Sequence, residues 1–338
     1  MKRTQLLALL FLLLLTIPVH SRANDAGVVT QHLHGAGATF PLNIYNRWIL
    51  NFFRAERLLV KYDGVGSGAG VKSIMSSSVD FGASDRPLAR EQLDAAGLIQ
   101  IPMVLGGLAV VVNLPGIEDN SLRLSGELLA EIYRGDIKNW NDLRIASLNP
   151  KLTLPDLSIT PIHRKRKSGS TWLFTTYLGN HNSDWKRAFG AVQQLEWPAG
   201  KAAVGTSGMA SAVRDAPGAI GYVDFSTSES KRLNKVLLDN RSGNYVAISH
   251  QAIQAASEHA DWYRDASIVD MPGADVWPIS AVTFILLPEN RLDRTKKLRA
   301  QAFISWCLKD GERYVDPMGY IPLPDEAISF SLEQLNKL

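Results

Sequence analysis

The chain reads His34-Gly35-Ala36-Gly37-Ala38-Thr39-Phe40-Pro41 just before an amphipathic run, and this stretch is its most informative feature. In the run that follows, over residues 41–54, apolar side chains recur every three or four positions, which predicts a helix with one buried face. The first N–H groups of a helix have no partner within it and lie at the positive end of its dipole. A loop of small residues that ends in such a helix start is therefore suited to hold an oxyanion.

Two later stretches repeat this pattern. Gly64-Val65-Gly66-Ser67-Gly68-Ala69-Gly70 leads from a predicted strand at 58–62 into a predicted helix at 67–76. Ser168-Gly169-Ser170 likewise stands before a predicted helix at 171–178. The sequence thus predicts three helix starts that could converge on one anion.

The remaining apolar runs alternate between strand and helix patterns. Further strands are predicted at 79–85, 98–104, 108–112, 159–163, 219–225 and 277–287, and further helices at 126–133, 204–213, 252–264 and 298–308. This alternation predicts an α/β fold with a largely parallel sheet. No Pro/Gly/Ser-rich linker separates two domains, as expected where strands cross between them.

The N-terminus has the pattern of a secretory signal. Residues 1–23 combine a basic start, an uncharged apolar run over residues 6–19 and a small-residue ending, which predicts a signal peptide that is removed. A membrane anchor is the other interpretation, but the run is shorter than the roughly 20 residues that span a bilayer. Removal takes away three basic residues and no acidic one, so the formal net charge falls from +3 to zero. A neutral mature chain argues against a nucleic-acid partner.

Nothing in the sequence points to catalysis or to a cofactor. The single cysteine, Cys307, has apolar neighbours that predict a buried thiol, although a reactive thiol or a pairing between chains is the alternative. We find neither a histidine–carboxylate metal cluster nor a nucleophile with an evident base. We therefore expect no catalytic residue, no metal and no enzymatic activity.

Several motifs occur in the order of a known family. They lie at residues 35–41, 64–70, 79–87, 136–142, 168–178, 217–224 and 277–287. Together they closely resemble the periplasmic phosphate-binding protein of the bacterial phosphate ABC importer. The resemblance implies a type II periplasmic-binding fold, in which two α/β lobes joined by two crossover strands hold the ligand between them.

The resemblance also divides the chain. We expect a signal peptide at 1–23, a discontinuous first lobe at 24–109 with 277–338, and a second lobe at 110–276. The crossover strands are expected near 108–113 and 277–283.

Eight residues match the positions that contact phosphate in this family. They are Thr39, Phe40, Ser67, Asp85, Arg164, Ser168, Gly169 and Ser170. Hydroxyls and backbone N–H groups donate to phosphate oxygens, and Arg164 adds a planar pair of donors. An ionised Asp85 would accept the proton that phosphate keeps at neutral pH, whereas sulfate has no proton to offer. The unpaired carboxylate would then disfavour sulfate by several kcal/mol, roughly a thousandfold.

Each of these residues also has an ordinary interpretation. Thr39 and Ser67 could be helix caps, and Asp85 before Arg86-Pro87 could satisfy its own turn. Lys165-Arg166-Lys167 could be a solvated basic loop. Where the family commonly has aspartate and glycine, this chain has Arg166 and Lys167, so we expect a more positive cleft and a less firmly oriented Arg164.

These patterns predict a secreted receptor that captures inorganic phosphate and delivers it to the membrane permease of an ABC importer. We expect it to be periplasmic and monomeric. A receptor of the same fold for another oxyanion or an organic phosphate is one alternative. A secreted phosphatase or phosphotransferase, or an adhesion or regulatory protein that has lost transport, are the others.

Overall fold

The computed structural model describes residues 32–338. The predicted signal peptide lies outside the described residues. Within residues 32–338, no helix is both long enough and apolar enough to cross a bilayer.

One mixed sheet runs through the described residues. Its strands, in spatial order, are β2 (Val60–Gly64), β1 (Leu33–Gly37), β3 (Phe81–Ser84), β12 (Ser280–Pro288), β4 (Leu98–Val112), β8 (Ala219–Asp224), β6 (Thr160–Arg164) and β7 (Lys201–Ala203). A further strand, β9 (Asn234–Lys235), pairs with β4, and a small second sheet contains β11 (Tyr245–Val246), β10 (Leu237–Asp239) and β5 (Arg123–Leu124).

The expectation of a largely parallel sheet is only partly correct. β1 is parallel to β2 and β3, and β6 is parallel to β7 and β8. Between these two groups, β12 is antiparallel to β3 and β4, and β4 is antiparallel to β8. The direction of the strands therefore changes within the sheet, at β12 and β4. Strand periodicity does not reveal which strands are neighbours or in which direction each one runs.

The prediction of two strands at 98–104 and 108–112 is wrong, because β4 is one continuous strand. Gly106 and Gly107, which lie between the two predicted strands, are needed for packing and form no turn. A Cβ on Gly106 would lie 2.5 Å from the Phe40 ring, and one on Gly107 would lie 2.7 Å from Ile253. Glycine in a strand marks such a close approach as well as a turn.

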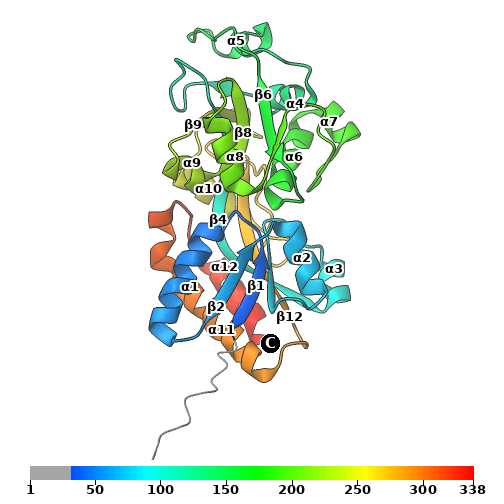
Figure 1. The fold of residues 1–338 in the computed structure, drawn as a ribbon, viewed down its shortest axis with the longest axis vertical. Coiled ribbons are helices and arrows are strands. Elements are labelled where there is room, and N and C mark those ends of the chain that lie inside the picture. Colours follow the sequence, from blue (N-terminus) through cyan, green and yellow to red (C-terminus); the bar gives the residue numbers. More distant parts are fainter. Residues whose placement is uncertain (1–31) are drawn as a thin grey trace, which may run out of the picture. The chain divides into compact units, whose positions relative to one another are not determined.

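Helices cover the sheet in two groups, which Figure 1 shows as two lobes connected by β4 and by the chain that enters β12. Lobe 1 contains α1 (Leu42–Glu56), α2 (Ser67–Met75), α3 (Arg90–Ala96), α11 (Arg294–Lys309) and α12 (Asp325–Asn336). Lobe 2 contains α4 (Gly126–Arg134), α5 (Leu143–Leu148), α6 (Gly169–His181), α7 (Ser183–Ala188), α8 (Gly205–Arg214), α9 (Phe225–Ser230) and α10 (His250–Ser257). The helix predicted at 252–264 ends early, because Asp261 begins a separate turn by accepting from the N–H of Arg264.

Large aromatic side chains fill the core of both lobes. Trp140 and Trp277 are fully buried, and each indole donates to a backbone carbonyl, of Gly218 at 3.0 Å and of Leu108 at 3.2 Å. Cys307 is buried in α11, which confirms the predicted buried thiol, and burial raises the pKa of that thiol well above its usual range.

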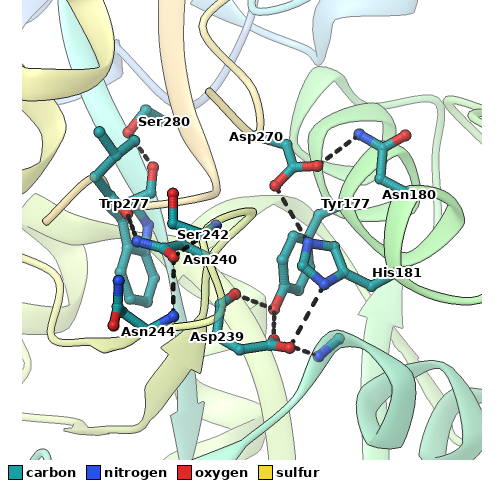
Figure 2. Close-up of polar contacts among 12 residues, drawn as sticks. Tyr177, Asn180, His181, Asp239, Asn240, Ser242, Asn244, Asp270, Trp277 and Ser280 are labelled. Atoms are coloured by element: carbon teal, nitrogen blue, oxygen red, sulfur yellow. Dashed lines mark hydrogen bonds and ion pairs between the residues drawn. The ribbon is translucent and has the colours of Figure 1, made fainter. Parts of the chain in front are cut away.

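A polar network anchors the C-terminal end of α6 in lobe 2 (Figure 2). His181 contacts two carboxylates, with Nε2 lying 3.2 Å from Asp270 and Nδ1 lying 3.6 Å from Asp239. Tyr177 donates to Asp239 at 2.7 Å, and Asn180 donates to Asp270 at 2.9 Å. Burial alone would lower the pKa of His181, but hydrogen bonds and the charges of both carboxylates raise the pKa to about 9. At neutral pH the network therefore contains a protonated imidazolium between two carboxylates.

Candidate anion-binding site

The start of α1 contributes Thr39 and Phe40. The Phe40 ring is buried, and its carbonyl accepts from the Tyr320 hydroxyl at 2.7 Å, so the side chain anchors the loop in the core. The N–H groups of Thr39 and Phe40 donate to no other residue within 32–338. The Thr39 hydroxyl accepts from Nη2 of Arg164 at 3.2 Å, which connects lobe 1 to lobe 2.

The start of α2 places Ser67 beside Asp85 and the start of α6. The Ser67 hydroxyl oxygen accepts from the N–H of Gly169 at 3.2 Å and from the N–H of Asp85 at 3.3 Å. It also lies 3.3 Å from Oδ2 of Asp85 and can donate to it. A Cβ on Gly169 would lie 2.7 Å from both the Asp85 Cβ and the Ser67 oxygen. Glycine therefore allows the backbone of α6 to approach lobe 1.

Asp85 follows β3 and is buried. Its Oδ1 accepts from the Thr283 hydroxyl of β12 at 3.1 Å. Burial raises the pKa of Asp85 to about 7, although the Thr283 hydrogen bond and the nearby Arg164 charge oppose the rise. Near neutral pH the ligand-free carboxyl therefore exchanges readily between an acceptor form and a protonated form.

Arg164 ends β6 and is buried, with only 5% of its surface exposed. Its backbone N–H donates to the Tyr222 hydroxyl at 3.2 Å. Its Nε–H has no partner among the described residues, as expected for a loop without an aspartate. Burial lowers the pKa of Arg164, while Tyr222, Asp85 and Asp224 act in the opposite direction. A buried guanidinium with an unpaired N–H is well placed to receive an anion.

The start of α6 contributes Ser168, Gly169 and Ser170, all buried. Ser168 occupies the N-cap position, yet its hydroxyl caps no backbone N–H of the helix. Its own N–H donates to the carbonyl of Gln193 at 3.0 Å, which fixes the loop.

The eight candidate residues thus come from both lobes, and hydrogen bonds bring five of them together. Thr39 contacts Arg164, and Ser67 contacts Asp85 and Gly169. The other three, Phe40, Ser168 and Ser170, are chain neighbours of these five. Their role as phosphate contacts stays a prediction.

Three residues of the site were missed from the sequence. Thr206, at the start of α8, lies with its hydroxyl 3.3 Å from that of Thr39, and Gly205-Thr206-Ser207 repeats the pattern that located the other helix starts. Thr283 is a polar residue within the apolar run of β12, and this break in the apolar pattern could have identified it as a site residue. Tyr222, which supports Arg164, lies in an apolar strand and gave no signal.

The basic residues of the third loop lie on the outside. Arg166 and Lys167 are exposed, and the Lys167 side chain packs over Gly68, where a Cβ would come within 2.6 Å of it. Neither residue has a left-handed backbone. They therefore do not line the buried site. A more positive cleft, as expected from the sequence, would require their side chains to reach it.

Comparison with known proteins agrees with this architecture. A model described as a PBP superfamily domain matches residues 22–310. The phosphate-binding protein PstS of Haemophilus influenzae is 38% identical over 299 residues, which cover 87% of this chain and 90% of that protein. PstS of Xylella fastidiosa is 37% identical, over 88% of this chain and 82% of that protein.

A similar fold occurs among solved structures. A putative phosphate ABC transporter substrate-binding protein from Clostridium perfringens, solved with bound phosphate, has a TM-score of 0.65 at 20% identity. That match covers 87% of this chain and 100% of the other. The two-lobed α/β architecture and the identity to curated relatives together show that this chain belongs to the PstS family of phosphate-binding proteins, within the PBP superfamily.

Proposed function

We propose that this chain is a receptor that binds inorganic phosphate between its lobes and delivers it to the membrane permease of an ABC importer. The observation that carries the proposal is the contact of Arg164 and Gly169 from lobe 2 with Thr39 and Ser67 from lobe 1, at hydrogen-bond distances of 3.2 Å, beside the buried Asp85. The identity of the chain to PstS proteins supports the same function.

Phosphate would be held by donors from three helix starts. The N–H groups of Thr39 and Phe40 and the hydroxyl of Ser67 would bind it from lobe 1, and Ser168, Gly169 and Ser170 would bind it from lobe 2. The unpaired Nε–H of Arg164 would complete the cage. The N–H of Gly169 now donates to the Ser67 hydroxyl at 3.2 Å, so these two groups would exchange that bond for bonds to phosphate.

Asp85 would select for an anion that carries a proton. Thr283 donates to its Oδ1 and Ser67 can donate to its Oδ2, and the carboxylate keeps further lone pairs that would accept from the phosphate O–H. Sulfate would leave the same carboxylate facing a fully ionised oxygen in a buried site. The carboxyl must be ionised for this role, and the nearby charge of Arg164 favours the ionised form.

The expected lobes are residues 24–109 with 277–338 and residues 110–276, with a cleaved signal peptide at 1–23 that sends a monomer to the periplasm. The antiparallel pairing of β4 with β12 as far as Gly107, and with β8 from Leu108 onward, supports a boundary at this point. A receptor for an organic phosphate gains no support, because Arg166 and Lys167 lie on the surface.

Calorimetric titration of the mature protein with phosphate, alone and against excess sulfate, tests the proposal. We expect one phosphate per chain and no displacement by sulfate. An assay for phosphate-ester hydrolysis on the same preparation tests the absence of enzymatic activity. Hydrolysis, or binding of neither anion, would reject the receptor function.

A further inference from the structure

A surface groove crosses the junction of the two lobes, outside the candidate phosphate site. It has a volume of about 750 Å³ and is lined from lobe 1 by α2, with Arg86 and Gln92, and from lobe 2 by Arg166, Lys167 and Gln193. We call it the seam groove. Because both lobes contribute walls, its shape depends on how the lobes lie against one another.

The seam groove is strongly cationic. Lys72, Arg86, Arg166 and Lys167 line it, whereas no aspartate or glutamate does. Within residues 32–338, none of these four side chains forms an ion pair. Four like charges without counter-ions on one concave surface attract an anionic partner.

Apolar side chains also line the seam groove. Val65 and Met75 line it and are exposed by 38% and 43%, which makes them two of the larger exposed apolar side chains of the protein. A single phosphate ion is much smaller than the groove and would leave this apolar surface in water. Exposed apolar side chains that are rimmed by charge are typical of a protein interface.

We propose that the seam groove docks an acidic segment of the membrane permease, with at least one apolar side chain on Val65 and Met75, and only when the lobes are closed. This inference rests on the proposed transport function. A partner that binds only the closed form favours closure, and by linkage phosphate raises its affinity for the receptor to the same extent. The permease would thus bind the phosphate-loaded receptor more tightly than the empty one.

Phosphate uptake into vesicles that contain the cognate permease, measured against receptor concentration, tests this inference. The test variant, Lys72→Glu/Arg166→Glu, reverses one charge in each lobe. The matched control, Arg47→Glu/Lys165→Glu, makes the same change of charge at exposed residues that do not line the groove. Calorimetry establishes the phosphate affinity of each variant.

We expect the test variant to bind phosphate like the wild type but to need about tenfold more receptor for half-maximal uptake. Raising the salt concentration should weaken uptake with the wild type more than with the test variant, because salt screens the charges. The control variant should behave like the wild type in both measurements.

Equal half-saturation for the test and control variants would overturn the inference, as would a loss of phosphate affinity in the test variant. A change in self-association alone, seen by analytical ultracentrifugation, would assign the groove to a second copy of the chain and also overturn it. Absence of uptake with the wild type, by contrast, would reject the transport function itself.

Discussion

At the residue scale, Asp85 combines burial with two polar neighbours, and this combination decides its chemistry. Thr283 holds one carboxyl oxygen at 3.1 Å, and Ser67 lies 3.3 Å from the other. The sequence alone indicated a carboxylate at an anion site, because Asp85 matches the family motif. It did not indicate how the carboxylate is positioned, because Thr283 is 198 residues away in the chain.

Asp85→Asn should reduce the discrimination between phosphate and sulfate. The amide removes the charge that repels sulfate, so we expect the ratio of the two dissociation constants to fall by at least about tenfold. Competitive calorimetry at constant pH measures this ratio. Asp94→Asn, at an exposed carboxylate of α3, should leave it unchanged. An unaltered ratio in Asp85→Asn would assign selectivity to other residues.

The ligand-free protein should lose stability as the pH rises from about 4 to about 7. The pKa of Asp85 is about 7 in the folded state, above the ordinary value of 3.8, so the folded protein binds more protons across this range. Stability therefore falls as Asp85 ionises in its buried site. Denaturant unfolding at several pH values should show a smaller decrease for Asp85→Asn than for the wild type. Parallel curves for the two proteins would contradict this assignment.

At the element scale, the positions of the helix starts could be predicted from the sequence. The contacts that hold these helix starts together could not. Periodicity located α1, α2, α6 and α8 to within a few residues, because each has a small-residue loop before an apolar stripe. It divided β4 wrongly, because a glycine that makes room for Phe40 reads the same as a glycine in a turn. Contacts such as Arg164 with Thr39 depend on which strands are neighbours, and no local pattern specifies that.

Gly169→Ala should weaken phosphate binding, because the new methyl group would meet Asp85 and Ser67 at 2.7 Å and hold α6 away from lobe 1. We expect at least about a tenfold loss of affinity by calorimetry, from a clash of roughly 1–3 kcal/mol. Gly179→Ala on the same helix is the control, since its Cβ would have no neighbour nearer than 3.8 Å. Equal effects of the two substitutions would show that α6 need not approach so closely.

The network around His181 should make lobe 2 sensitive to alkaline pH. The pKa of His181 is about 9 in the folded state and 6.5 ordinarily, so its stabilising effect is complete below about pH 6.5. The effect is lost as the pH rises through 9. Denaturant unfolding at pH 6.5 and pH 9.5 should show a smaller difference for His181→Gln than for the wild type. His259→Gln, at an exposed histidine, should retain the wild-type difference. Identical pH dependence of both variants would remove His181 from this role.

At the scale of the whole molecule, β4 belongs to both lobes. Its residues 98–107 pair with β12, and residues 108–112 pair with β8. The sequence predicted two α/β lobes through the family resemblance, but the mixed direction of the sheet followed only from the pairing of β4 with β12. Such long-range pairing has no signature within a short window of sequence.

The protein should therefore unfold in one cooperative transition. Loss of β4 removes a strand from both lobes at once, so neither lobe is expected to persist without the other. Differential scanning calorimetry should give equal calorimetric and van't Hoff enthalpies. Phosphate at 100 times its dissociation constant should stabilise this single transition by about 2.7 kcal/mol. Two resolved transitions, of which phosphate shifts only one, would contradict the prediction.

The position of β12 also affects how the chain is made. This strand lies between β3 and β4 at the centre of the sheet, yet it comes from residues 280–288, near the end of the sequence. A ribosome that has released the first 250 residues has therefore not yet supplied the strand that joins β3 to β4. The sheet of lobe 1 can therefore form in full only after residues 280–288 have been made, whereas β6, β7 and β8 of lobe 2 can already pair with one another.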